Sequence, residues 1–168
     1  RNFQEILANL WWKLDKGLYE DGVRYSALAL LADATKYGCT TLFDHHASPN
    51  CIDGSLDIEA DAITESGLRA SLCYEVTDRD GEERALAGIR ENGRFVSGVQ
   101  AGKYGSMLKA HFGLHASLTV GEQTLEKCLA ENNNRVGFHV HAAEGIVDQE
   151  DLLSKYGKRV VERFADAG

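Results

Sequence analysis

Three absences limit what this 168-residue chain can be. No apolar stretch approaches the roughly 20 residues that a membrane-spanning helix needs. Basic residues are not in excess: 26 acidic residues against 18 basic ones give a formal net charge of −8, which argues against a nucleic-acid or anionic-membrane surface. The four cysteines form no CxxC pair. We therefore expect free thiols in a reducing cytoplasm, three of them in buried strands or helices.

What the chain does contain is the composition of one globular domain. Hydrophobic residues make up 43% of it and charged residues 26%, which is enough apolar surface for one core and is not the composition of a disordered chain. Its start, Arg1-Asn2-Phe3-Gln4, is neither a signal peptide nor an initiating methionine. We expect a single domain over residues 1–168 that is an internal piece of a longer cytoplasmic protein.

Helical and strand-like segments alternate along the chain. Apolar residues at helical spacing over 24–37 end at Gly38 and precede a short β-prone run, and the pattern then recurs. The expected strands cover residues 39–44, 68–74, 107–114 and 135–141, and the expected helices cover residues 3–18, 24–37, 56–66, 81–92, 122–131 and 148–167. The Gly-rich stretch 98–105 is expected to be a loop. Short connections between alternating elements predict parallel strands with right-handed crossovers, and the helix at 3–18 is expected to pack outside the sheet.

Four strand–helix units are half of a closed (β/α)8 barrel, which typically needs about 250 residues. The predicted fold class is therefore α/β, a partial (β/α)8 TIM barrel of about four βα units with parallel strands. An open doubly wound sheet is the rival. Its phosphate-binding fingerprint is missing, because the stretch from Gly98 to Gly102 precedes a strand instead of following one. A nucleotide-binding module is disfavoured for the same reason.

The histidines gather where parallel α/β folds collect their chemistry, at the carboxyl ends of strands. Those at or next to a predicted strand end are His45, His46, His115, His139 and His141. His111 lies earlier in its strand, and we interpret it as structural. Period-two alternation puts His139 and His141 on the same face of their strand, and Glu144 follows on the loop.

This arrangement suits metal-assisted hydrolysis. A neutral imidazole such as that of His141 binds a divalent transition metal, the metal acidifies a bound water, and a nearby carboxylate such as that of Glu144 moves the proton. The structural alternative is a core histidine pair beside a solvated glutamate.

Three stretches of the chain resemble the amidohydrolase superfamily. The stretch from Gly38 to Asp44 resembles its second barrel strand, Gly113 to Val120 is similar to the end of its fourth, and His139 to Glu144 resembles its fifth-strand His-x-x-Glu motif. Residues 1–168 resemble most closely the branch that contains guanine deaminase, adenosine-type deaminases and triazine hydrolases, and within it the aminohydrolases called SsnA. The piece would cover about barrel strands 2–5.

The resemblance implies roles for individual residues. It implies that His141 is a metal ligand for one divalent metal, zinc or iron, in the parent protein, and that Glu144 is the catalytic proton shuttle. It implies that His115 faces the substrate. His45 is a candidate substrate contact at the mouth, with a solvent-exposed loop position as the alternative. His139 is expected in the second shell of the site or in the core.

Other polar residues near the strand ends have plainer expected roles. His46, like His45, is either a substrate contact at the mouth of the site or a solvent-exposed loop residue. Glu75 and Asp78 follow the third barrel strand of the family, and we expect them on a loop surface. The carboxylated lysine of two-metal amidohydrolases has no counterpart, because Leu114-His115 occupies that position and Lys109 lies at the other end of the strand. The resemblance therefore favours a site for one metal.

The metal site is expected to be incomplete in this chain. The family's His-x-His pair on the first strand, its sixth-strand His and its eighth-strand Asp have no counterpart, and a catalytic zinc usually needs three protein ligands. We expect the isolated chain to be inactive and to bind metal weakly or not at all.

The predicted function is a fragment of a metal-dependent aminohydrolase, which deaminates a small amino-substituted heterocycle by a metal-activated water. A parent acting as a hydrolytic dechlorinase is a close variant. The unrelated zinc deaminases marked by Pro-Cys-x-x-Cys are excluded. The alternative from another class is a non-catalytic half-barrel unit. Either way, exposed sheet edges predict a homo-oligomer, and no nucleic-acid or membrane partner is expected.

Overall fold

The computed structural model describes residues 3–168 and begins with a helical segment. α1 (Phe3–Ile6), the π-helical stretch η1 (Leu7–Trp11) and α2 (Trp12–Gly17) follow one another directly, and α3 (Glu20–Lys36) comes next. The later elements are β1 (Thr41–Phe43), α4 (Ser55–Ser66), β2 (Arg69–Leu72), α5 (Glu82–Gln100), β3 (Leu108–Ala110), β4 (Phe112–Ala116), η2 (Ser117–Thr119), α6 (Glu122–Asn132), β5 (Phe138–His141), α7 (Ile146–Tyr156) and α8 (Val160–Ala167).

The strands are all parallel, as the sequence predicts. One sheet has the order β1-β2-β3, and a second consists of β4 and β5. Only His111 separates β3 from β4, and a parallel bridge between Val76 and Leu114 links the segment after β2 to β4. The four expected strands therefore lie side by side in chain order, with all their carboxyl ends at one edge.

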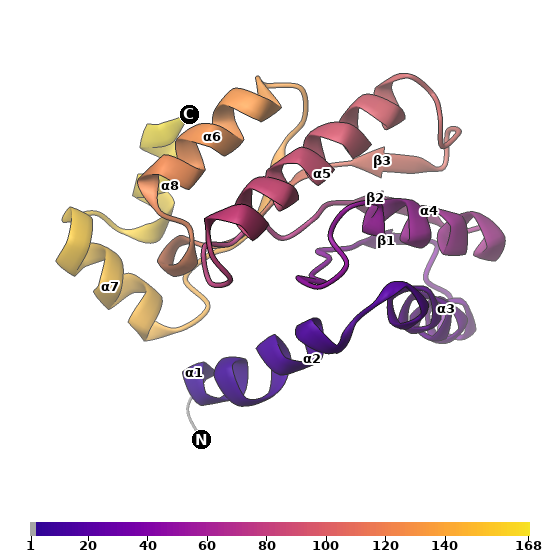
Figure 1. The fold of residues 1–168 in the computed structure, drawn as a ribbon, viewed down its shortest axis with the longest axis horizontal. Coiled ribbons are helices and arrows are strands. Elements are labelled where there is room, and N and C mark those ends of the chain that lie inside the picture. Colours follow the sequence, from indigo (N-terminus) through magenta and orange to yellow (C-terminus); the bar gives the residue numbers. More distant parts are fainter. Residues whose placement is uncertain (1–2) are drawn as a thin grey trace.

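Helices cover the strands and enclose two apolar clusters. Figure 1 shows α5 and α6 on one side of the strands and the segment from α1 to α2 on the other. α4 contacts β2, and α5 contacts both β3 and β4. Phe95 on α5 is fully buried in the cluster under β1, β2 and β3, and Phe112 is fully buried in the cluster under β4 and β5. The buried apolar area on the strand faces fixes the register, since a one-residue slip would turn it to solvent.

The helix expected over 81–92 is longer than predicted, because α5 continues to Gln100. Its glycines mark close packing and not a loop. A Cβ at Gly93 would lie 2.1 Å from Oε1 of Glu131, and one at Gly98 would lie 2.7 Å from the ring of Tyr104. A side chain at Gly98 would displace the Tyr104 ring, whereas one at Gly93 would displace only the flexible end of Glu131.

The single helix expected over 148–167 is in fact two helices. Gly157 adopts φ 66°, a left-handed conformation that ends α7, and α8 then starts after Arg159. Asp148 lies inside the first turn of α7, where its Oδ2 accepts the N–H of Ala143 at 2.9 Å.

The first helical segment was expected to pack outside the sheet, and it does lie outside it, with its side chains facing residues that follow the carboxyl ends of the strands. Leu10, Trp11 and Leu14 are largely exposed, and the segment lies across the carboxyl ends of the strands. Its contacts there are made by Trp12 and Asp15, which meet Arg79. Of the cysteines, Cys73 and Cys128 are buried, one fewer than expected, and all four are free. Within residues 3–168 no helix combines the length and apolarity that crossing a bilayer requires.

Candidate active site

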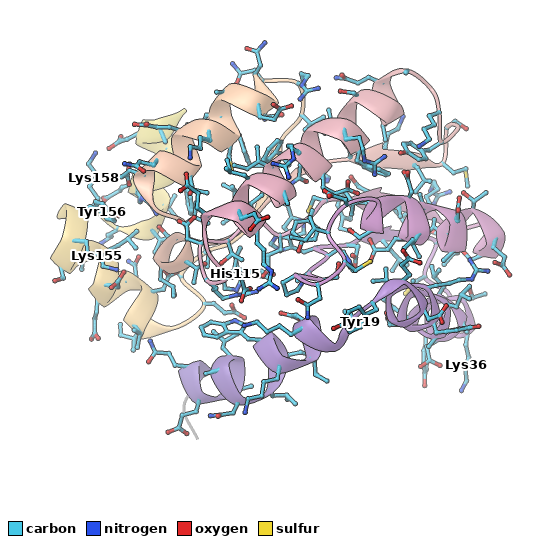
Figure 2. All side chains as sticks on the ribbon, viewed as in Figure 1. Tyr19, Lys36, His115, Lys155, Tyr156 and Lys158 are labelled. Carbon is cyan, nitrogen blue, oxygen red and sulfur yellow. The ribbon has the colours of Figure 1, made fainter. Side chains whose placement is uncertain are left out.

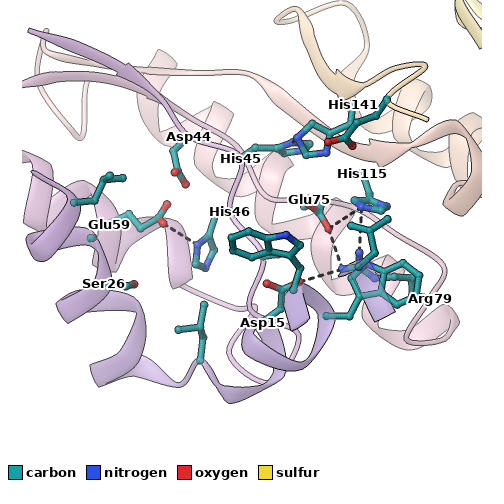
Figure 3. Close-up of a pocket in the computed structure, with 18 residues that line it drawn as sticks. Asp15, Ser26, Asp44, His45, His46, Glu59, Glu75, Arg79, His115 and His141 are labelled. Carbon is teal, nitrogen blue, oxygen red and sulfur yellow. Dashed lines mark hydrogen bonds and ion pairs between the residues drawn. The ribbon is translucent and has the colours of Figure 1, made fainter. Parts of the chain in front are cut away.

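A cavity of about 470 Å³ lies between the carboxyl ends of the strands and the segment from α1 to α2. Figure 2 shows His115 in this space, pointing from the sheet toward the N-terminal helices. His141 and Glu144 both line the cavity, as the sequence predicts. Figure 3 shows two groups of polar side chains within it, one around His141 and His115 and one around His46.

His141 faces a second imidazole across the cavity. Its Nε2 lies 3.2 Å from Nδ1 of His45, which comes from the loop after β1. The ring of His45 stacks on that of His139, with 4.5 Å between centroids. Burial, with the neighbouring rings of His141 and His139, lowers the pKa of His45 to about 2, so this imidazole is neutral. Nε2 of His45 is buried and has no hydrogen-bond partner among the described residues.

His115, at the end of β4, is buried and has both ring nitrogens in contact with protein. The guanidinium of Arg79 donates to Nε2 at 3.2 Å, and Nδ1 contacts the hydroxyl of Thr119. Because arginine is always a donor, His115 accepts at Nε2 and carries its proton on Nδ1. Burial, followed by the charge of Arg79, lowers the pKa of His115 to about 3. This histidine is therefore a neutral, oriented group at the cavity wall.

Glu75 is a site residue that the sequence analysis placed wrongly on a loop surface. It is buried, lines the cavity, and accepts a hydrogen bond from Arg79 at 2.9 Å. Burial raises the pKa of Glu75 to about 8, although Arg79 opposes this rise. By contrast, Asp78 is exposed as expected, and it accepts the N–H of Gly121 at the start of α6.

Arg79 and Asp15 are further site residues that the sequence analysis did not identify. Arg79 lies 3.5 Å from a carboxylate oxygen of Asp15, and its guanidinium stacks on the ring of Trp12 at 4.9 Å. Burial raises the pKa of Asp15, with Arg79 opposing the rise. Through these contacts the N-terminal segment is fastened to the same arginine that orients His115.

The other end of the cavity holds Asp44, His46 and Glu59. His46 is buried, and we call these three residues the acid end. Nδ1 of His46 lies 2.7 Å from Glu59, and Nε2 lies 2.8 Å from the hydroxyl of Ser48, which itself donates to the carbonyl of Cys51. Burial opposes protonation of His46, but the Glu59 carboxylate outweighs it and raises the pKa. Burial and then Glu59 raise the pKa of Asp44 to about 7.

Glu144 is exposed and lies on the loop between β5 and α7. The preceding residue, Ala143, has φ 55°, which is uncommon for a residue other than glycine. The hydrogen bond from Ala143 to Asp148 ties this loop to the first turn of α7. A second recess of about 320 Å³ adjoins the cavity and shares Glu144 and His115 with it. Its wall is mostly apolar and includes Leu7, Ala8, Trp12, Leu118, Ile146 and Val147.

The side chains around His141 fit a divalent metal. Ligand atoms of His45, Glu75 and His141 all lie within 4.8 Å of one another. Imidazole nitrogen with carboxylate oxygen is the donor set that zinc and iron accept. The atom of His45 that faces His141 is Nδ1, so each of the two rings turns one nitrogen toward the other.

The chain belongs to the amidohydrolase family, whose model matches residues 2–167. It is 31% identical to the 5'-deoxyadenosine deaminase of Methanosarcina barkeri, over 96% of this chain and 35% of that protein. It is 30% identical to the 5-methylthioadenosine/S-adenosylhomocysteine deaminase 2 of Archaeoglobus fulgidus, over 93% of this chain and 36% of that protein. The chain thus spans about a third of the length of these relatives.

Solved structures show the same fold. An adenosine deaminase from Xanthomonas campestris with bound zinc matches all of this chain and 37% of its own, with a TM-score of 0.81 and 17% identity. The atrazine chlorohydrolase of Arthrobacter aurescens, complexed with zinc, matches 98% of this chain and 39% of its own, with a TM-score of 0.70 and 18% identity. The predicted partial (β/α)8 barrel is therefore confirmed. The finer resemblance to SsnA stays a prediction.

Proposed function

We propose that this chain carries part of the active site of a metal-dependent aminohydrolase that deaminates an amino-substituted heterocycle. The observation that carries the proposal is that His141, Glu144 and His115 line one cavity at the carboxyl ends of parallel strands. The named activities of the relatives support it, because they are deaminases of 5'-deoxyadenosine, 5-methylthioadenosine and S-adenosylhomocysteine. Adenosine-type nucleosides are therefore the first substrates to test.

In this proposal His141 is a ligand of one divalent metal, zinc or iron, held in the whole protein. The metal, when bound, supplies the acidified water that attacks the ring carbon. Glu144 takes the proton from that water and returns it to the departing amine, so that ammonia leaves. Its exposed position on the loop also lets it exchange protons with solvent.

The remaining residues bind and orient the substrate. His115 and His45 line the cavity on either side of His141, and we assign them to contacts with the heterocycle. Arg79 donates a hydrogen bond to Nε2 of His115, so its guanidinium lines the same side of the cavity as the histidine. His139, stacked on His45, holds that ring from behind. The apolar recess beside Glu144 suits an apolar substituent of the substrate.

The test uses the parent protein, loaded with zinc or iron, and a panel of adenosine derivatives, amino-purines, pyrimidines and triazines. We expect ammonia release from at least one compound, and Glu144→Gln should lower kcat by about 10²-fold or more because it removes the proton shuttle. Lys109→Gln, an exposed position on β3, is the matched control and should keep full activity. Full activity of Glu144→Gln would refute the proposal, and chloride release without ammonia would show the dechlorinase instead.

The non-catalytic alternative makes its own prediction. A half-barrel unit that works by assembly would form a homo-oligomer through its sheet edges and release no ammonia in any form of the parent. Light scattering on the chain measures the first property. A monodisperse monomer would count against the oligomer that we expect.

A further inference from the structure

We propose that the acid end is a second binding subsite of the cavity, which holds a cationic hydrogen-bond donor, an alkylammonium group, on a substituent of the substrate. Figure 3 shows Asp44, His46 and Glu59 together in one group, with His115 and His141 in the other. The inference rests on the proposed function, because it takes from it the heterocycle that lies at His141. It adds a charged group of the substrate and the residues that recognise this group.

The acid end contains a buried hydrogen-bond acceptor that the fold does not use. Oε1 of Glu59 meets His46, whereas Oε2 is buried and has no hydrogen-bond partner among the described residues. The Glu59 side chain is only 8% exposed, and buried acceptors are normally paired. Ligand atoms of Asp44, His46 and Glu59 all lie within 4.8 Å of one another. Because two carboxylates this close repel each other, a donor that contacts both is favourable.

The charges of the acid end favour a cation as that donor. Within residues 3–168, His46 is the only basic side chain in an ion pair with either carboxylate, so at most one positive charge stands against two acidic groups. His46 offers no lone pair to a ligand, because Nδ1 contacts Glu59 and Nε2 contacts the hydroxyl of Ser48. The atoms left to bind a ligand are carboxylate oxygens, which form their strongest hydrogen bonds with charged donors.

The other carboxylates of the cavity are less suited to this role. Those of Asp15 and Glu75 both lie against the guanidinium of Arg79, at 3.5 Å and 2.9 Å, so each already has a cationic partner. Glu144 is exposed, and an ion pair at an exposed position contributes little to binding. A cationic group that enters the cavity is therefore expected at the acid end.

The acid end belongs to the same cavity as the groups assigned to the reaction. Asp44 and Glu59 line it together with His141 and Glu144, and its volume is about 470 Å³. A ligand can therefore place its ring at His141 while its ammonium group contacts the acid end. In this position Asp44 and Glu59 select and orient the substrate, and they take no part in breaking the C–N bond.

The experiment compares two series of adenines by calorimetry on the parent protein, which is stripped of metal with a chelator so that no turnover occurs. Each compound carries an alkyl chain at ring nitrogen N9, and chain length rises by one methylene at a time. The chains of one series end in an amine, and those of the other end in a methyl group. We expect one amine to bind at least about tenfold more tightly than its methyl counterpart, which is the size of a charged hydrogen bond.

Variants assign this preference to the acid end. Asp44→Asn and Glu59→Gln should each abolish it and leave the affinity for the methyl series unchanged, which also shows that the cavity is folded. Asp61→Asn, an exposed position on the same helix as Glu59, is the matched control and should keep the full preference.

The wild-type comparison decides the inference even where a variant does not fold. Equal affinities for the two series at every chain length would overturn it, as would a full preference for the amine in a folded Asp44→Asn variant. These measurements do not depend on ammonia release. Failure of the deamination assay would therefore leave the binding result intact, and a lack of preference for the amine would leave the proposed deamination intact.

Discussion

The two ends of the cavity contain the same kinds of side chain and differ in what those side chains already bind. At the acid end, both nitrogens of His46 donate hydrogen bonds, to Glu59 and to Ser48. At the other end, His45 keeps one buried nitrogen without a partner, and its second nitrogen meets another imidazole, that of His141. Carboxylate and imidazole atoms lie within 4.8 Å of one another at both ends.

The difference teaches that what each imidazole already binds, and not its residue type, decides which histidine can accept a ligand. At the acid end the unpartnered atom is a carboxylate oxygen, Oε2 of Glu59. His46, with a partner at each ring nitrogen, cross-links the loop after β1 to α4. His45 lies on the cavity wall with one buried nitrogen that has no hydrogen-bond partner, and a buried polar group of this kind is uncommon in folded proteins and calls for an explanation. The two clusters look alike when only the distances between imidazoles and carboxylates are compared.

The largest expected effect tests the structural role of the acid end. His46→Ala removes the partner of a buried carboxylate and should destabilise the fold by about 3–5 kcal/mol. His45→Ala breaks no such pair, and we expect a loss of about 1 kcal/mol. Urea unfolding of both variants in the presence of a chelator measures the two values. Equal losses of unfolding free energy in the two variants would contradict the proposed difference between the two ends of the cavity.

A middle-sized effect tests how the N-terminal segment is held at the imidazole end. Arg79→Met removes the contacts with Glu75, Asp15 and the Trp12 ring, and charged hydrogen bonds are worth about 1.5–3 kcal/mol each. We expect faster tryptic cleavage at Lys13 and Lys16. Arg90→Met, at an exposed position on α5, is the matched control and should be cleaved at the wild-type rate. Equal rates in the two variants would mean that other contacts hold the segment.

The smallest expected effect comes from a charged cluster outside the cavity. Asp57 on α4 contacts Tyr104, Lys103 and Arg94. Burial alone would raise its pKa, but the hydrogen bond from Tyr104 and the two cations outweigh burial and lower it. A lowered pKa stabilises the fold above the unfolded-state value of 3.8, and this stabilisation is lost as the pH falls further.

Asp57→Asn should therefore cost at most about 1 kcal/mol at neutral pH. The difference from the wild type should shrink below pH 3.8 and in high salt, because exposed charges are screened. Unfolding midpoints across pH and salt measure it. A loss as large as that of His46→Ala would show that surface charge matters as much as the buried pairs.

The sequence predicts the parallel strands and the placement of His141, Glu144 and His115 at their ends, because both follow from local periodicity. It misses Glu75, yet a signal was present. The β-prone residues Val76 and Thr77 continue the strand pattern past Tyr74, and the bridge at Val76 agrees with that pattern and places Glu75 at the same edge as His115. Asp15 had no such signal. Its position depends on where a helical segment distant in the sequence crosses the sheet, and local patterns do not contain that information.

The hydrogen bond between Ala143 and Asp148 couples the position of Glu144 to that of α7. The loop that carries Glu144 is fastened to the first turn of this helix, so a shift of the helix also carries the carboxylate. Substitutions on the outer surface of α7 would then alter the reach of Glu144. Under the proposed function, the rate of the reaction would depend on how this peripheral helix packs, although most of its residues lie far from the substrate.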